Sequence, residues 1–211
     1  RAYPALRSDR AVQLFDRVRP KLMQGLRQSS DSQAALLHFD MFLKGLPAGV
    51  QLFSLFEANP HLVDLIVDIC ATSPDLAAYL SRNSGVLDAV LGGGFFAPWP
   101  ESAVLDADLA TVLEQTSDYE AALDVTRRWK KEWHFRIGVH HLRGLITAGQ
   151  AGRQYADLAV AVVRGLTPYV EHQFAAKHGA APGQGAAIIA MGSLGAGALQ
   201  STSDLDLIVV Y

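Results

Sequence analysis

The feature that most constrains the fold is a helical hydrophobic periodicity, which runs from the start of the chain to about residue 178. In the first segment apolar side chains recur every three or four residues, at Ala11, Phe15, Val18, Leu22 and Leu26. Several later segments open with sequences typical of helix starts, at Ser30–Gln33, Ser73–Asp75 and Ser117–Glu120. The pattern predicts a mainly α chain built as an array of amphipathic helices.

The pattern changes after the last helical segment. Gly179–Gly185 has the composition of a loop, and residues 186–191 form a short apolar run of strand length. Residues 192–203 are small and polar, and residues 205–211 are rich in β-branched side chains, which predicts a buried strand. We therefore expect the helical array to lead into the first strands of an α/β domain.

A segment rich in glycine and proline, Gly92–Pro100, predicts a boundary inside the chain, because this composition excludes regular structure. We expect a helical segment over residues 1–96 and a second domain over residues 101–211, with helices within 103–178 and strands at 186–191 and 205–211. The first residue is Arg, and the last residues belong to a predicted strand. The sequence is therefore expected to be a piece of a longer protein, with the second domain truncated at its C-terminal side.

Composition excludes several classes of function. The net charge is -3, which argues against a protein that binds nucleic acid through bulk positive charge. No apolar run reaches the roughly 18 residues of a membrane span, so no membrane partner is expected. The single cysteine, Cys70, excludes an internal disulfide and favours a reducing compartment, so we expect a cytoplasmic protein.

Two aspartates near the end of the chain are the strongest chemical signal. Asp204 and Asp206 are two residues apart at the start of a predicted strand, which would place both carboxylates on one face. Such a pair repels itself unless a divalent cation such as Mg²⁺ neutralises it. Gly192 and Ser193 follow the preceding predicted strand, where glycine lets a backbone approach a phosphate. The pattern indicates nucleotidyl transfer, with a solvated acidic strand end as the alternative.

Other nucleotide and metal motifs are absent from the sequence, which contains neither a P-loop nor a G-x-G-x-x-G fingerprint. Residues 127–143 hold six Lys or Arg against one acid, Glu132, and are apolar on two nearly opposite sides. This helix is predicted to be part of the core, with its bases either on solvated strips or facing a triphosphate or an acidic partner. Its histidines, His134, His140 and His141, lack the spacing of a metal site.

Residues 191–211, MGSLGAGALQSTSDLDLIVVY, resemble the nucleotidyltransferase signature of the glutamine synthetase adenylyltransferase family. The resemblance extends upstream over residues 46–91, 127–146 and 151–163, and so covers most of the chain. The wording of residues 46–60 is similar to the second, adenylylating half of these bifunctional enzymes.

The resemblance implies a DNA polymerase β-like nucleotidyltransferase domain preceded by helices. It implies transfer of AMP from ATP to a tyrosine hydroxyl of glutamine synthetase, with release of pyrophosphate, and removal of AMP elsewhere in the whole protein. It also implies control of nitrogen metabolism through PII signal proteins and glutamine. By resemblance, Asp204 and Asp206 are the catalytic carboxylates that hold Mg²⁺, while Gly192, Ser193 and Ser203 contact the nucleotide.

The sequence departs from the family pattern at Gly197-Ala198, where relatives commonly carry an Arg-Glu pair. The third metal carboxylate of the family lies on a later strand, so the 211-residue chain by itself is expected to be inactive. Two alternatives stay open from the sequence. One is a helical docking or regulatory module that binds glutamine synthetase or PII without catalysis, and the other is a different polymerase β-like nucleotidyltransferase.

Overall fold

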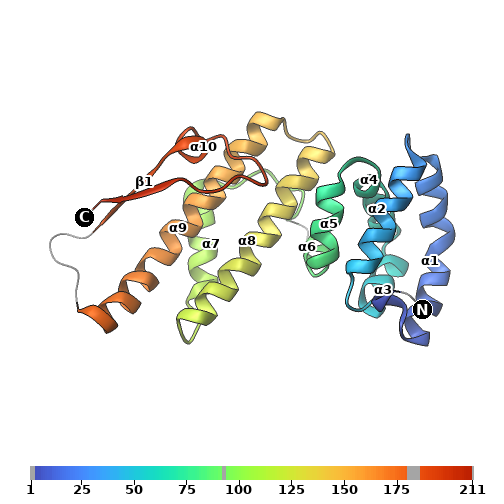
Figure 1. Ribbon diagram of the computed structural model, residues 1–211, viewed down its shortest axis with the longest axis horizontal. Coiled ribbons are helices and arrows are strands. Elements are labelled where there is room, and N and C mark those ends of the chain that lie inside the picture. Colours follow the sequence, from blue (N-terminus) through green and yellow to red (C-terminus); the bar gives the residue numbers. More distant parts are fainter. Residues whose placement is uncertain (1–2, 92–93, 180–185, 211) are drawn as a thin grey trace. The chain divides into compact units, whose positions relative to one another are not determined.

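The computed structural model describes residues 3–91, 94–179 and 186–210, and most of these are helical (Figure 1). Within the described ranges strands occur only after residue 186, as the periodicity predicts. The chain divides into two compact units, Arg1–Asp88 and Ala89–Tyr211. Of the predicted linker, Gly92 and Gly93 lie outside the described residues, and residues 94–100 contain no helix or strand.

The first unit is helical in all of its described elements. These are the short 3-10 helix η1 (Pro4–Leu6), α1 (Asp9–Gln28), α2 (Ser32–Gly45), α3 (Val50–Ala58), α4 (Pro60–Thr72) and α5 (Pro74–Arg82), while α6 (Val86–Leu91) crosses the boundary. The predicted stripe forms the inner face of α1, with Leu14 buried and Phe15 only partly buried beside it. Burial of these stripes, rather than helix propensity, supplies most of the stability of such short helices.

The observed N-cap residue agrees with the sequence prediction at one of three helices and lies one residue later at the other two. Ser73 caps α5 as predicted, by accepting a backbone N–H bond. At the other two predicted starts the cap is the following aspartate, Asp31 for α2 and Asp118 for α8 (Tyr119–Leu142), and the predicted caps Ser30 and Ser117 lie one residue too early. A carboxylate is the stronger acceptor and also interacts favourably with the helix dipole, which accounts for the shift.

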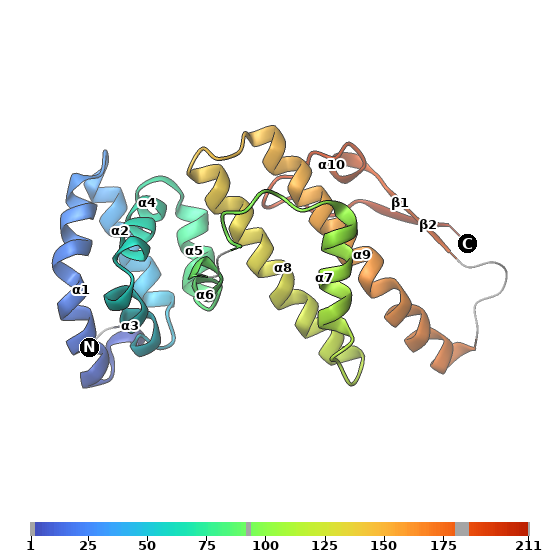
Figure 2. The same cartoon turned by 180° about the vertical axis from the view of Figure 1, so that it is seen from behind.

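The core of the second unit is a bundle of three helices, α7 (Ser102–Leu113), α8 and α9 (Ala148–His178), which lie side by side in both views (Figures 1 and 2). Each contributes three buried side chains to one apolar cluster: Leu105, Leu109, Leu113, Ala122, Trp129, Ile137, Ala151, Leu158 and Ala161. The close contact of α9 with α7 depends on Gly165, where a Cβ would lie 2.7 Å from the Leu109 side chain. Helix α9 begins at Ala148, directly after Thr147, which forms a capping box with Gln150.

Helix α8 is buried on two sides, as its sequence predicts, but not all of its bases lie on solvated strips. Arg136 is only 8% exposed, and its guanidinium donates to the backbone carbonyls of Ala97 and Pro98. His140 is also buried and lies 2.7 Å, Nε2 to O, from the Phe95 carbonyl. These two side chains fasten the segment before α7 to α8, which is a structural role.

The chain's two described strands form a small ribbon. Strands β1 (Ala187–Ala190) and β2 (Leu207–Val210) pair antiparallel, with Ala187 opposite Val210 and Ala190 opposite Leu207 (Figure 2). The prediction of a buried second strand is wrong, since Ile208 is 48% and Val209 56% exposed. Apart from Ala190, which is partly buried against Leu194, Leu199 and Ala156, the residues of both strands are exposed. Residues 180–185 of the predicted loop and Tyr211 of the predicted strand lie outside the described residues. The polymerase β-like sheet stays a prediction.

Candidate functional site

The segment between the two strands carries all five predicted site residues, Gly192, Ser193, Ser203, Asp204 and Asp206. It opens with α10 (Gly192–Gly195), a single helical turn. Gly192 has a φ of +52°, a conformation that side chains disfavour. A Cβ on Gly195 would lie 2.6 Å from the Ala190 carbonyl oxygen, so this glycine lets the turn pack on the end of β1. Gly192 and Ser193 are both exposed at the surface of the turn.

The structure brings Asp206 together with this turn. The Met191 N–H donates to the Asp206 carbonyl oxygen at 2.8 Å, N to O, where the ribbon begins. The Asp206 carboxylate occupies the space in which a Gly192 side chain would begin. Glycine is therefore required twice at this position, for its backbone angle and for the approach of the carboxylate.

Asp204 and Asp206 do not lie in the strand as expected. Strand β2 begins at Leu207, so both aspartates belong to the loop before it and the alternation of side chains along a strand does not apply to them. Both are exposed. Ser203 is partly buried, and its Oγ accepts the Gln200 N–H at 3.0 Å while its own N–H donates to the Gln200 carbonyl at 3.1 Å. Ser203 thus closes a turn directly before the aspartates, and its predicted contact with a nucleotide stays a prediction.

Helices α8 and α9 hold this loop through contacts that the sequence does not reveal. Leu194 and Leu199 are buried against Ala156 of α9. Gly152 lies so close that a Cβ would be 3.3 Å from the Leu199 carbonyl oxygen. His134 of α8 reaches the Ser201 carbonyl at 3.0 Å, Nε2 to O. The spacing of apolar residues in α9 could have indicated a second apolar face on this helix. The loop residues that contact this face lie about forty positions further along the chain, and periodicity does not show which distant residues a face will contact.

Burial shifts the ionisation of the two aromatic side chains beside the loop. The His134 and Tyr155 rings are 4.8 Å apart between centroids. Desolvation is the main cause that lowers the pKa of His134, and it raises the pKa of Tyr155 to about 12. Both side chains are therefore neutral near pH 7, and they supply shape and a hydrogen bond rather than charge.

A polar cleft of about 420 Å³ lies beside the loop, between Gly197 and the first turns of α9. Arg153 and Asp157 are its charged lining residues, and Asp157 already accepts the indole N–H of Trp99 at 3.1 Å. The cleft offers a cation and amide groups, but no nucleophile or carboxylate pair.

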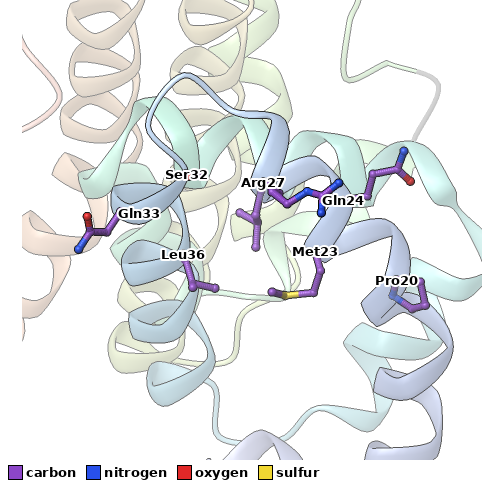
Figure 3. Close-up of a pocket in the computed structure, with 8 residues that line it drawn as sticks. Pro20, Met23, Gln24, Arg27, Ser32, Gln33 and Leu36 are labelled. Carbon is purple, nitrogen blue, oxygen red and sulfur yellow. The ribbon is translucent and has the colours of Figure 1, made fainter.

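The first unit has a cavity of a different kind, about 560 Å³ in volume, between α1 and α2 (Figure 3). Met23 and Leu36 approach each other across it and are 42% and 45% exposed. No carboxylate lines this cavity, whose side chains are Pro20, Met23, Gln24, Leu26, Arg27, Ser32, Gln33 and Leu36. Its chemistry suits apolar contact rather than group transfer.

Asp204 and Asp206 are suitable ligands for a magnesium ion. No group of three His, Cys, Asp or Glu side chains that could hold a metal occurs among the described residues. Mg²⁺ is commonly held by one or two carboxylates and completes its shell with substrate phosphates and water. Asp204 and Asp206 offer hard oxygen ligands of this kind at an exposed position. Among the described helices none is both long and apolar enough to cross a bilayer.

Comparison with known proteins decides the family. Residues 63–211 match the family model described as glutamate-ammonia ligase adenylyltransferase. The chain belongs to this family. The matched range includes the five predicted site residues, the three helices of the bundle and both strands. The resemblance drawn from the sequence is thereby confirmed.

Several relatives that match carry the name bifunctional glutamine synthetase adenylyltransferase/adenylyl-removing enzyme. The protein from Brucella melitensis is 37% identical over 209 residues, and the alignment covers 99% of this chain and 21% of the relative. The Rhizobium meliloti protein is 38% identical over 209 residues, with the same coverage of 99% and 21%. The chain therefore spans about a fifth of the length of the relatives that it matches.

Proposed function

We propose that the chain forms part of an enzyme that transfers AMP from ATP to a tyrosine hydroxyl of glutamine synthetase, in a protein that also removes the AMP. Membership of the family supports this proposal, and so do relatives named for both activities. Because the chain spans 21% of such a relative, the complete reaction is proposed for the whole protein.

One observation carries the catalytic part of the proposal: the Asp206 carboxylate lies against Gly192 at the turn between the strands. Because Gly192 has no side chain, the carboxylate and a cation bound to it could lie next to the backbone of the turn, where a phosphate would bind. In the proposed reaction the tyrosine hydroxyl loses its proton to water, and its oxygen forms a bond to the α-phosphorus of ATP. The bond from that phosphorus to the bridging oxygen breaks, and pyrophosphate leaves.

The residues of this chain would act mainly by placing charge. We propose that Asp204 and Asp206 hold Mg²⁺, which when bound neutralises charge on the phosphates. Gly192 and Ser193 would line the phosphate path, while the Ser203 turn sets where the aspartates begin. Positioning and charge neutralisation supply most of the catalysis in phosphoryl chemistry, so no nucleophilic side chain is needed here.

A second role is supported by the first unit. The exposed apolar cavity between α1 and α2 favours contact with a protein, and we propose that glutamine synthetase or a PII protein docks on this unit.

A different polymerase β-like nucleotidyltransferase is not supported by the family match. A cytoplasmic location forms part of the same proposal, and the single buried cysteine agrees with it.

The test of the reaction is a labelling experiment with the full-length protein, glutamine synthetase and Mg²⁺. ATP labelled at the α-phosphorus should transfer label to glutamine synthetase, whereas ATP labelled at the γ-phosphorus should transfer none. Glutamine synthetase that lacks the acceptor tyrosine is the control. Transfer of the γ-label would indicate a kinase and would contradict the proposal.

A further inference from the structure

We propose that His134 is a positioning residue, which holds the loop that carries Asp204 and Asp206 in the geometry needed for AMP transfer. The inference rests on the proposed function, since it concerns the same site. His134 lies on α8, and its Nε2 is 3.0 Å from the carbonyl oxygen of Ser201, a residue 67 positions further along the chain. A carbonyl oxygen only accepts, so Nε2 carries the hydrogen.

The bond to Ser201 fixes one end of the acidic segment. Ser201 lies inside the turn that the two Gln200–Ser203 hydrogen bonds close. The other end is fixed by the Met191 N–H bond to the Asp206 carbonyl. Asp204 lies between these two hydrogen-bonded carbonyls, so both bonds help to determine the position of its carboxylate.

The apolar contacts of the loop do not replace this bond. Leu199 is 5% exposed and anchors the start of the loop against α9. Apolar contact is non-directional and permits rotation about the buried side chain, whereas a hydrogen bond to a carbonyl fixes direction. The Tyr155 ring packs beside the imidazole and restricts its orientation. His134 is therefore the group that orients the turn relative to the helices.

The expected loss falls on function more than on folding. A single hydrogen bond at a partly buried position makes a modest net contribution to stability. In metal sites the loss of a group that orients a ligand commonly costs about 10–100-fold in metal affinity or activity. A residue with a purely structural role would lower activity only in step with folding.

The test compares two variants at position 134 with a control in the full-length protein. His134→Phe keeps an aromatic ring beside Tyr155 and removes the donor, and His134→Gln keeps an N–H donor on a flexible chain. His141→Phe is the control, because His141 is exposed and seven residues along the same helix. The rate of AMP transfer is measured against Mg²⁺ concentration, together with the thermal midpoint of each variant.

For His134→Phe we expect the Mg²⁺ concentration at half-maximal rate to rise about tenfold or more, with a nearly unchanged thermal midpoint. His134→Gln should recover most of the loss, and His141→Phe should behave as the unaltered protein. An unchanged Mg²⁺ dependence in His134→Phe would overturn the inference, as would a loss that tracks the midpoint in both variants. If the unaltered protein transfers no AMP, the proposed function itself fails.

Discussion

Replacement of Gly192 by alanine tests the most constrained point of the site. The backbone there has a φ of +52°, and the new Cβ would overlap the Asp206 carboxylate. The left-handed conformation costs a non-glycine residue about 1–2 kcal/mol. Overpacking typically costs a further 1–3 kcal/mol or so, because the carboxylate and its loop must move. We expect a total loss of about 2–5 kcal/mol in the free energy of unfolding.

Gly197→Ala provides a matched control for the backbone cost alone. Gly197 has a φ of +62°, and a Cβ there would meet nothing within 4 Å. It should lose only about 1–2 kcal/mol. The difference between the two variants isolates the displacement of Asp206.

The measurement is urea unfolding of the chain, with Asp206→Ala completing a double-mutant cycle. Removal of the carboxylate should make Gly192→Ala no more costly than Gly197→Ala, because the displaced atoms are gone. Equal losses in the two glycine variants, or a Gly192→Ala cost that Asp206→Ala does not change, would show that the Asp206 carboxylate does not lie against Gly192.

Burial of Cys70, His134 and His140, and the fact that the chain spans about a fifth of its relatives' length, lead to further tests. Burial raises the pKa of the Cys70 thiol to about 12, so a disulfide reagent near pH 8 should label it only after denaturation, and rapid labelling of the folded chain would contradict its burial. Burial is also the main cause that lowers the pKa of His134 and His140 below the usual value of about 6.5. Both imidazoles are therefore harder to protonate in the folded state than in the unfolded state. The stability that this gives is fully present above about pH 6.5 and is lost as the pH falls through the lowered pKa values. The thermal midpoint should drop between about pH 7 and pH 5. A flat profile would show that neither imidazole matters. The 211-residue chain alone, incubated with labelled ATP, Mg²⁺ and glutamine synthetase, should transfer no AMP, and incorporation of label by this chain would show that no further ligand is needed.

Helical periodicity predicts most of the fold, because each helix must bury one stripe of apolar residues. The spacing of residues within the helix itself shows where this stripe lies. The α1 residues from Ala11 to Leu26 show this directly. The exposed strand β2 shows the limit. Its β-branched residues predict a strand, but whether a strand is buried depends on which elements cover it, and this is decided elsewhere in the chain.

The candidate site divides in the same way. Gly192 and Asp206 can be singled out from their residue types and neighbours, and the structure brings them together. The bonds of His134 to Ser201 and of Arg136 to Ala97 join residues far apart in the sequence. A histidine or an arginine on a helix carries no local signal for such a contact, so only the folded chain reveals it.

In the proposed mechanism Asp206 and Asp204 serve catalysis rather than folding. The most direct measurement is the initial rate of AMP transfer and the thermal midpoint, on the same preparations of full-length Asp206→Asn, Asp204→Asn and a control, Asp124→Asn. Asp124 is exposed and pairs with its helical neighbour Arg127 at 2.6 Å, so its loss should be nearly neutral. Each of the other two variants should lose the rate by orders of magnitude at an unchanged midpoint, since such electrostatic contributions are worth several kcal/mol. A stable Asp206→Asn protein that transfers AMP at the rate of the control would contradict the account.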